Sequence, residues 1–284
     1  MRMQFKAPEA SACRRASNDN APHPRPPLTG RRLRDDILMG IRFYSRLPTG
    51  DRAHEVPDLH RMAPALPFVS LMLALGPAVI LSIGAQIGLP GPAAAAIAVL
   101  VGVMITGAMA EDALADAADG LFGGATPERR LEIMKDPRHG TYGISALCLL
   151  LILRVFILAG LISIGPLDAF GAWIAASILG RSGALWLAAK LPSARRSGLS
   201  ATVGRLGMTP FCMGAALALA LTFIFAGPVA GMLGLGVAVL ACLAVASGWA
   251  KLVRSKVGGQ TGDLIGALQA LLEISALLVL LIFA

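Results

Sequence analysis

The sequence predicts an all-α protein, a polytopic membrane bundle of about seven transmembrane helices. Apolar residues make up 56% of the 284 residues, charged residues only 15%, and the mean hydropathy is +0.70. A soluble domain carries roughly 25% charged residues, so this chain could not cover a surface that faces water. The composition therefore excludes a soluble enzyme, a disordered chain and a fibrous protein.

The first segment, residues 1–34, is rich in Pro, Arg, Ser and Asn and has no apolar run. This composition predicts a disordered, basic cytoplasmic tail. Residues 35–284 are expected to form a single membrane-embedded domain. It begins with an amphipathic interfacial helix at 35–47, whose arginines face lipid headgroups. The apolar residues of that helix recur at one-, three-, three- and three-residue spacings: Ile37, Leu38, Ile41, Tyr44 and Leu47.

Seven nearly uncharged stretches follow, each close to the ~20 residues that cross a bilayer. We place them at 66–87, 93–110, 143–164, 169–190, 210–227, 229–250 and 264–284. The short connections after the first, third and fifth stretches contain no Lys or Arg, whereas the other connecting segments hold nearly all of them. This asymmetry predicts a cytoplasmic N-terminus. It also explains the net charge of +8 better than nucleic-acid binding does, so no nucleic-acid partner is expected.

Three charged residues fall inside the predicted spans: Arg154, Arg181 and Glu273. Ionisable groups at membrane depth are expensive, so each is a candidate for a functional role. Glu273 with one of the arginines could equally form a buried structural pair. The four cysteines have no C-x-x-C spacing, which indicates neither a disulfide framework nor a zinc site.

The sharpest signal is acidic. Asp112, Asp116 and Asp119 are spaced i, i+4, i+7, which places three carboxylates on one face of a helix. Like charges at this spacing repel, and no Lys or Arg lies between Ala110 and Pro127. Carboxylate oxygens favour Mg²⁺ or Mn²⁺, so the pattern predicts a metal site. The alternative is a solvated acidic helix end.

The rest of the segment 111–143 adds polar groups. Gly123-Gly124 ends the first helix, and Thr126-Pro127 supplies the N-cap and first-turn proline of a second helix. A fourth carboxylate, Asp136, lies beside Lys135 and Arg138. Carboxylates for a metal and cations for phosphate oxygens are what phosphoryl transfer needs. His139 could act in acid–base chemistry or, as we favour, in binding or structure.

Before the last span, three basic residues precede the glycine-rich sequence GGQTGD at 258–263. A glycine–polar cluster that opens a helix suits phosphate or ribose binding. The sequence lacks the Lys-Ser/Thr end of a P-loop, so nucleotide hydrolysis is not indicated. Asp263 could contact a ligand or could simply be the N-cap of the final helix.

These blocks resemble a known family. The sequences EDALADAADGLFGG (111–124), RLEIMKDPRHGTYG (130–143) and GGQTGD (258–263) look like the signature blocks of cobalamin synthase, also called adenosylcobinamide-GDP ribazoletransferase. FYSRLP at 43–48 resembles an N-terminal element of that family, with Ser45 in place of Thr. The resemblance runs from about residue 36 to the C-terminus.

The resemblance implies a Mg²⁺-dependent enzyme in the inner (plasma) membrane of a bacterium, with its active site facing the cytoplasm. A ribose hydroxyl of α-ribazole, or of its 5′-phosphate, attacks the cobinamide-linked phosphate of adenosylcobinamide-GDP. GMP leaves, and adenosylcobalamin or its 5′-phosphate forms. The positions that match the family's acidic motifs are expected to be catalytic and to bind the metal: Asp112, Asp116, Asp119 and Asp136. Other matching polar positions are expected to contact substrate: Arg46, Lys135, Arg138, His139, Gln260 and Asp263.

The chain departs from the family pattern at two positions, where Ala110 replaces a common His and Ala113 a common Gly. Neither change affects a carboxylate. Two alternatives stay open: a phospholipid enzyme like the CDP-alcohol phosphotransferases, which share Asp116-x-x-Asp119-Gly120, and a cation-coupled transporter. The expected partners are the small-molecule substrates and the lipid bilayer, with a homo-oligomer or other pathway enzymes possible.

Overall fold

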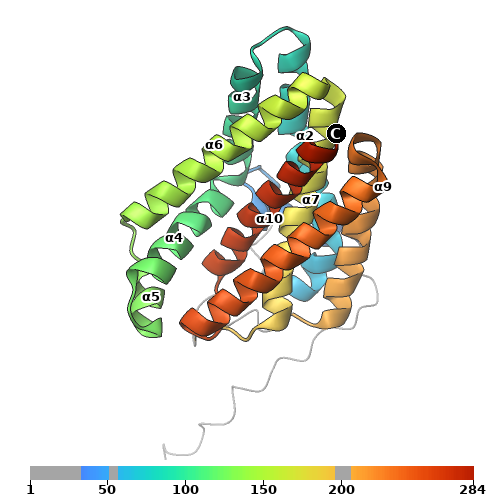
Figure 1. The fold of residues 1–284 in the computed structure, drawn as a ribbon. Coiled ribbons are helices and arrows are strands. Elements are labelled where there is room, and N and C mark those ends of the chain that lie inside the picture. The colour runs from blue at the N-terminus through green and yellow to red at the C-terminus, as the bar shows by residue number, and fades with distance from the viewer. Residues whose placement is uncertain (1–32, 51–56, 196–205) are drawn as a thin grey trace, which may run out of the picture. The chain divides into compact units, whose positions relative to one another are not determined.

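The structure is a computed structural model that describes residues 33–50, 57–195 and 206–284. All regular elements within these ranges are helices, which confirms the all-α class (Figure 1). The predicted tail lies outside the described residues up to Arg32. The helices are α1 (Leu33–Tyr44), α2 (Leu59–Gln86), α3 (Gly91–Thr106), α4 (Met109–Gly123), α5 (Pro127–Ile133), α6 (Thr141–Ile164), α7 (Pro166–Lys190), α9 (Met208–Val257) and α10 (Gly262–Phe283).

Helix α7 is the centre of the bundle. Of its most apolar stretch, 89% is buried inside the protein, and it packs against α2, α9 and α10. A Cβ added at Gly171 would meet the carbonyl oxygen of Phe225 in α9, and one at Gly180 would lie 3.0 Å from the carbonyl oxygen of Gln269 in α10. Small residues thus bring the helix backbones close together, as is common in membrane bundles.

Five helices are long and apolar enough to cross a membrane, or six if α3 and α4 form one bent span. Helix α9 is counted once, although Figure 1 shows it folding back into a hairpin. The backbone leaves the helical conformation at Gly231, where φ is 64° and ψ is −176°. The membrane bundle is therefore confirmed, whereas the number of seven spans stays a prediction.

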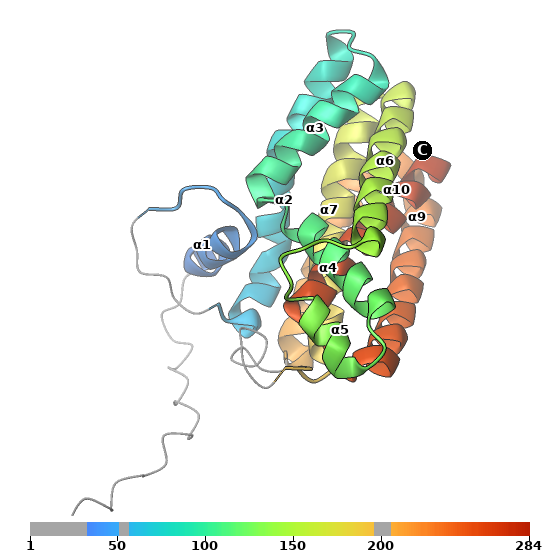
Figure 2. The same cartoon turned by 90° about the vertical axis from the view of Figure 1, so that its left-hand side faces the viewer.

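The second predicted span, at 93–110, is interrupted. Helix α3 ends at Thr106, and α4 leaves it at an angle of 86° (Figure 2). Gly107 and Ala108 form the bend with left-handed φ values of 65° and 59°. For alanine this conformation costs roughly 1–2 kcal/mol, and hydropathy alone does not reveal it. The bend directs the acidic residues of α4 away from the axis of α3.

Helix α1 begins two residues before the predicted interfacial helix at 35–47 begins, and it ends three residues before that helix ends. It packs on α2, where Gly40 leaves room for the side chain of Val69. After α1 the chain turns, and the amide of Arg46 donates to the carbonyl oxygen of Ile105 at 2.8 Å. This contact joins the N-terminal element to the bend between α3 and α4. Its location at a membrane interface stays a prediction.

The connections predicted to face outward gather at one end of the bundle. Figure 1 shows the α2–α3 connection, the α6–α7 connection and the fold-back of α9 at the end away from α4 and α5. The acidic helix and the basic end of α9 therefore share the opposite end, as the charge asymmetry requires.

We expect this arrangement to appear in cysteine labelling of intact cells, in a variant without native cysteines. Leu89→Cys and Leu167→Cys, at exposed positions of the uncharged end, should react with an impermeant maleimide added outside. Ala125→Cys and Ser255→Cys, which are exposed at the other end, should react only after the cells are opened. The reverse labelling pattern would contradict the predicted orientation.

Candidate active site

The three aspartates of α4 occupy different environments. The side chain of Asp112 is 65% exposed and that of Asp116 is 20% exposed, whereas Asp119 is buried. These three carboxylates, which we call the acidic ladder of α4, therefore extend from the protein surface into the bundle. The predicted helix is present, but its carboxylates are not equivalent.

Asp119 anchors the start of α6. One of its carboxylate oxygens accepts the backbone N–H of Gly140 at 2.6 Å, and the other accepts that of Gly143 at 2.8 Å. Negative charge at a helix N-terminus satisfies free amides and interacts favourably with the helix dipole. A Cβ on either glycine would collide with this carboxylate. The glycines of the 130–143 block therefore have a structural purpose, which is to let Asp119 approach the backbone.

Asp112, Asp116 and His139 form the exposed part of the site. The His139 ring nitrogens lie 4.0 Å from an Asp112 carboxylate oxygen and 3.8 Å from an Asp116 oxygen. Asp116 lies outside the five candidate spans. Burial and the negative charges of Asp112 and Asp263 raise its pKa from 3.8 to about 6. Asp263 of α10 thus faces the same acidic region, which carries a surplus of negative charge.

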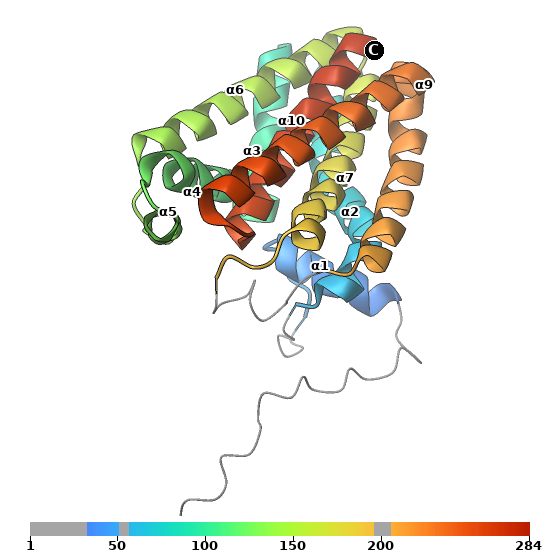
Figure 3. The same ribbon diagram turned by 60° about the horizontal axis from the view of Figure 1, so that its bottom comes forward.

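Helix α5 closes over α4 through two further glycines. Thr126 caps α5, as the sequence predicts, by accepting the amide of Arg129. The missing side chains of Gly120 and Gly124 leave room for Met134 and for the backbone of Arg130. Arg130 also donates to the carbonyl oxygen of Lys256 at 2.8 Å. The basic end of α9 therefore lies beside the acidic segment, as Figure 3 shows.

Asp136 binds Arg138 instead of joining the other aspartates. The guanidinium donates to both Asp136 oxygens, at 2.9 and 2.7 Å, and these hydrogen bonds lower the pKa of Asp136 to about 2. Lys135 is exposed next to this pair. Across the described ranges, no three His, Cys, Asp or Glu side chains are grouped closely enough to hold a metal ion. A site made of all four aspartates therefore stays a prediction.

The 258–263 block packs against the segment that follows α7. The amide of Gln260 donates to the carbonyl oxygen of Pro192, and the carbonyl oxygen of Gln260 accepts from Ala194. Its side chain is buried, and the amide oxygen Oε1 has no hydrogen-bond partner. Thr261 is the N-cap of α10. The N-cap alternative for Asp263 is therefore wrong, and its carboxylate accepts a hydrogen bond from the Thr261 hydroxyl at 3.4 Å.

Sequence reasoning missed two partners. Arg195 places its Nη2 3.1 Å from an Asp263 oxygen, and Glu111 accepts from Arg154 at 2.6 Å. Arg154 also lies 3.2 Å from Glu273, so the predicted buried pair of Glu273 with an arginine is confirmed. Charges at membrane depth need partners, so Glu111 could have been predicted from the sequence as a partner of Arg154. No sequence signal connects Arg195 to Asp263.

Arg46, a predicted substrate contact, is exposed beside the bend between α3 and α4. A Cβ on Gly107 would lie within 2.8 Å of its Cγ. The structure therefore places Arg46 against the bend between α3 and α4, where the acidic helix begins.

We expect Gly143→Ala to disrupt the anchor of Asp119. The new methyl group would displace the carboxylate and leave the buried Gly143 amide without its acceptor, at a cost of about 1–3 kcal/mol. Thermal unfolding of the purified protein should show a lower Tm. Gly123→Ala is the matched control on α4, because its methyl group would lie 3.9 Å from the nearest neighbouring atom, Cδ1 of Ile133, which is an ordinary van der Waals contact. Equal Tm values for the two variants would contradict the anchor.

The raised pKa of Asp116 predicts a pH-dependent effect of Asp116→Asn. An acid whose pKa rises from 3.8 to about 6 on folding destabilises the fold when ionised, so stability increases as pH falls through 6. In metal-free buffer at pH 7.5 the variant should gain about 2 °C or more in Tm. The gain should be smaller at pH 5, where the carboxyl of the folded wild-type protein is mostly protonated, and should vanish only below the unfolded-state pKa of 3.8.

Glu132→Gln, on the exposed face of α5, is the control for this comparison. Its Tm difference from the wild-type protein should not change between pH 7.5 and pH 5. A gain of Asp116→Asn that is the same at both pH values would contradict the electrostatic origin.

Comparisons with known proteins place the whole described domain in one family. The model of the cobalamin-5-phosphate synthase family matches residues 36–281. An adenosylcobinamide-GDP ribazoletransferase of Azorhizobium caulinodans is 42% identical over 261 residues, which cover 89% of this chain and 97% of the relative. Enzymes of the same name from a Sinorhizobium species and from Brucella ovis are 39% and 38% identical, and each alignment covers 86% of this chain. These alignments cover 94% and 95% of the relatives.

No solved structure matches the chain significantly. The family match covers the α4 ladder, the 130–143 block and the 258–263 block in a single alignment. The chain therefore belongs to the cobalamin-5-phosphate synthase family of membrane transferases, the adenosylcobinamide-GDP ribazoletransferases that carry out the final assembly step of cobalamin synthesis.

Proposed function

We propose that Asp112 and Asp116 bind Mg²⁺ and, with it, the diphosphate of adenosylcobinamide-GDP. The observation that carries the proposal is the uncompensated charge of this region. Asp112 and Asp116 face Asp263, and among the described residues neither of the two forms an ion pair with a Lys or Arg. A divalent cation would remove the repulsion that, together with the larger effect of burial, raises the pKa of Asp116.

The donor set fits this ion. Mg²⁺ is usually held by one or two carboxylates together with substrate phosphates and water, and Asp112 and Asp116 lie one helical turn apart on the open face of α4. When bound, the ion would neutralise charge on the reacting phosphates. Asp119 and Asp136 already accept hydrogen bonds from Gly140, Gly143 and Arg138. In our proposal they position the site instead of supplying ligands.

The basic residues beside the ladder are proposed to hold the phosphates. Arg138 is fixed by two hydrogen bonds to Asp136, and its fully charged fork suits phosphate oxygens. Lys135 is exposed on the same turn. His139, within 4.0 Å of Asp112 and Asp116, would contact the substrate at the edge of the acidic region. Gln260 offers an unpaired amide oxygen, which suits a hydroxyl or N–H donor of a substrate.

The proposed reaction is a phosphoryl transfer at the cytoplasmic face of the bacterial inner membrane. A ribose hydroxyl of α-ribazole, or of its 5′-phosphate, forms a new bond to the phosphorus on the cobinamide side. The bond from that phosphorus to the bridging oxygen breaks, GMP leaves with this oxygen, and the hydroxyl proton passes to solvent. Such reactions need positioning and charge stabilisation more than proton chemistry from the protein.

Asp112→Asn should reduce transfer at least about a hundredfold, because it removes a charge from the proposed ion site while it keeps the shape of the side chain. The measurement is GMP release by protein in vesicles, with adenosylcobinamide-GDP, α-ribazole and titrated Mg²⁺. Release of GMP that depends on α-ribazole separates this activity from that of a CDP-alcohol phosphotransferase or a transporter.

Asp168→Asn serves as the control, since Asp168 lies in the first turn of α7 at the other end of the bundle. This variant should keep wild-type turnover. Normal Mg²⁺-dependent turnover by Asp112→Asn and by Asp116→Asn would show that the ion binds elsewhere.

A further inference from the structure

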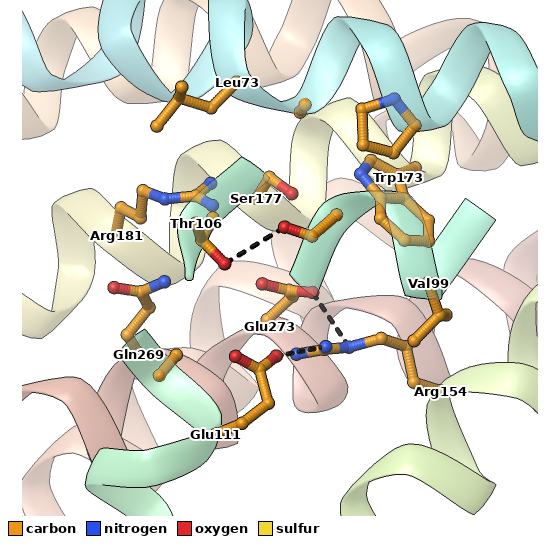
Figure 4. A pocket seen from close by; sticks show the side chains of 14 residues that line it. Leu73, Val99, Thr106, Glu111, Arg154, Trp173, Ser177, Arg181, Gln269 and Glu273 are labelled. Carbon is orange, nitrogen blue, oxygen red and sulfur yellow. Dashed lines mark hydrogen bonds and ion pairs between the residues drawn. The ribbon is translucent and has the colours of Figure 1, made fainter. Parts of the chain in front are cut away.

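A small polar cavity lies inside the bundle, behind the acidic face of α4. Its volume is about 30 Å³, and residues from α2, α3, α4, α6, α7 and α10 line it. Figure 4 shows four charged side chains at this cavity: Glu111, Arg154, Arg181 and Glu273. Each is at most 7% exposed. Two positive and two negative charges make the set neutral.

Arg154 of α6 joins two other helices. Its Nη1 lies 2.6 Å from a Glu111 oxygen of α4, and its Nε lies 3.2 Å from a Glu273 oxygen of α10 (Figure 4). These helices carry the proposed site and the carboxylate that faces it, because α4 bears Asp112 and Asp116 and Asp263 lies in the first turn of α10. One guanidinium therefore connects the two acidic elements from the interior of the bundle.

The same cavity contains polar atoms without partners. Glu111 Oε2 and the Nε and Nη1 atoms of Arg181 make no hydrogen bond. A cavity needs roughly 10–15 Å³ to hold one water molecule, so this one has room for water between the Arg181 donors and the Glu111 acceptor. Arg181 would thus complete the network through water, whereas Arg154 acts by direct contact.

Stability alone does not explain such an arrangement. A buried ion pair can often be replaced by apolar residues of similar size without loss of stability, because desolvation offsets the attraction between the charges. Directional contacts do, however, fix the geometry of the groups that make them. Glu111 directly precedes Asp112, so fixing Glu111 also fixes the backbone that carries the first rung of the acidic ladder.

We propose that Arg154 is a positioning residue, which acts through Glu111 to hold the backbone of α4 that carries Asp112 and Asp116 in the geometry that cation binding needs. This inference deepens the proposed function and rests on it. Arg154 touches neither substrate nor cation, and its effect should appear first in metal affinity and in the rigidity of α4.

The test compares two double variants of the full-length protein in lipid nanodiscs. Arg154→Met with Glu111→Leu removes the direct contact to α4 and leaves Arg181 and Glu273, one charge of each sign. Arg181→Met with Glu273→Leu is the matched control, since it removes one charge of each sign from the same cavity. It breaks the Arg154–Glu273 contact to α10 but keeps the Arg154–Glu111 contact to α4. Both variants replace charges by apolar groups, so neither leaves a single unpaired charge.

Three quantities are measured: Mn²⁺ affinity by electron paramagnetic resonance, hydrogen exchange of the α4 amides without metal, and Tm. The Arg154 variant should bind Mn²⁺ about tenfold more weakly or worse, as is typical when support around a metal ligand is lost. Its α4 amides should exchange faster, while Tm stays near the wild-type value. The control should keep wild-type affinity and exchange.

Unchanged affinity together with unchanged α4 exchange in the Arg154 variant would overturn the inference. Equal losses in both variants would also overturn it, because they would indicate a general structural role of the cavity. Failure of the proposed metal site would look different. Mn²⁺ binding by the wild-type protein would then not respond to Asp112→Asn, and the exchange of α4 would still decide the role of Arg154.

Discussion

The bend between α3 and α4 determines where the polar groups of this protein can lie. Helices α3 and α4 together have 31 residues, or about 46 Å of continuous helix at 1.5 Å per residue. A straight helix of that length would exceed the ~30 Å hydrocarbon thickness of a bilayer. Two residues in left-handed conformation turn the chain by 86° instead. The carboxylates of α4 can then face α6 and α10 at one end of the bundle.

Glycines make the contacts around this turned helix possible. Gly140 and Gly143 admit the carboxylate of Asp119, and Gly120 admits Met134 of the α5 segment. Gly266 of α10 does the same for the methyl group of Ala113. The contact between α4 and α10 thus accommodates the side chain of Ala113 because the opposite helix supplies the space. These glycines therefore meet a packing requirement.

The sequence predicted the helical class, the acidic face of α4 and the capped helix after it, because these depend on local periodicity and on residues close in the chain. It also predicted a buried partner for Glu273, since charges in a membrane need compensation. It did not predict the break at Gly107 and Ala108, because hydropathy does not report backbone conformation. The contact of Arg195 with Asp263 joins residues 68 positions apart, and no spacing rule connects them.

The two faces of α4 differ in their electrostatic interactions: carboxylates repel one another on one face, and an arginine attracts a carboxylate on the other. Asp112 and Asp116 repel each other and Asp263, so a loosely held α4 would move away from α10 to relieve the repulsion. Successive helical residues point about 100° apart, and Glu111 therefore faces the interior while Asp112 faces the site. On the interior side, Arg154 donates a hydrogen bond to Glu111 and forms an ion pair with Glu273, and the close contact at Gly266 holds the helices together. Attraction on the interior face of α4 thus opposes the repulsion on its acidic face, and this balance can keep Asp112 and Asp116 close to Asp263 for the cation that we propose.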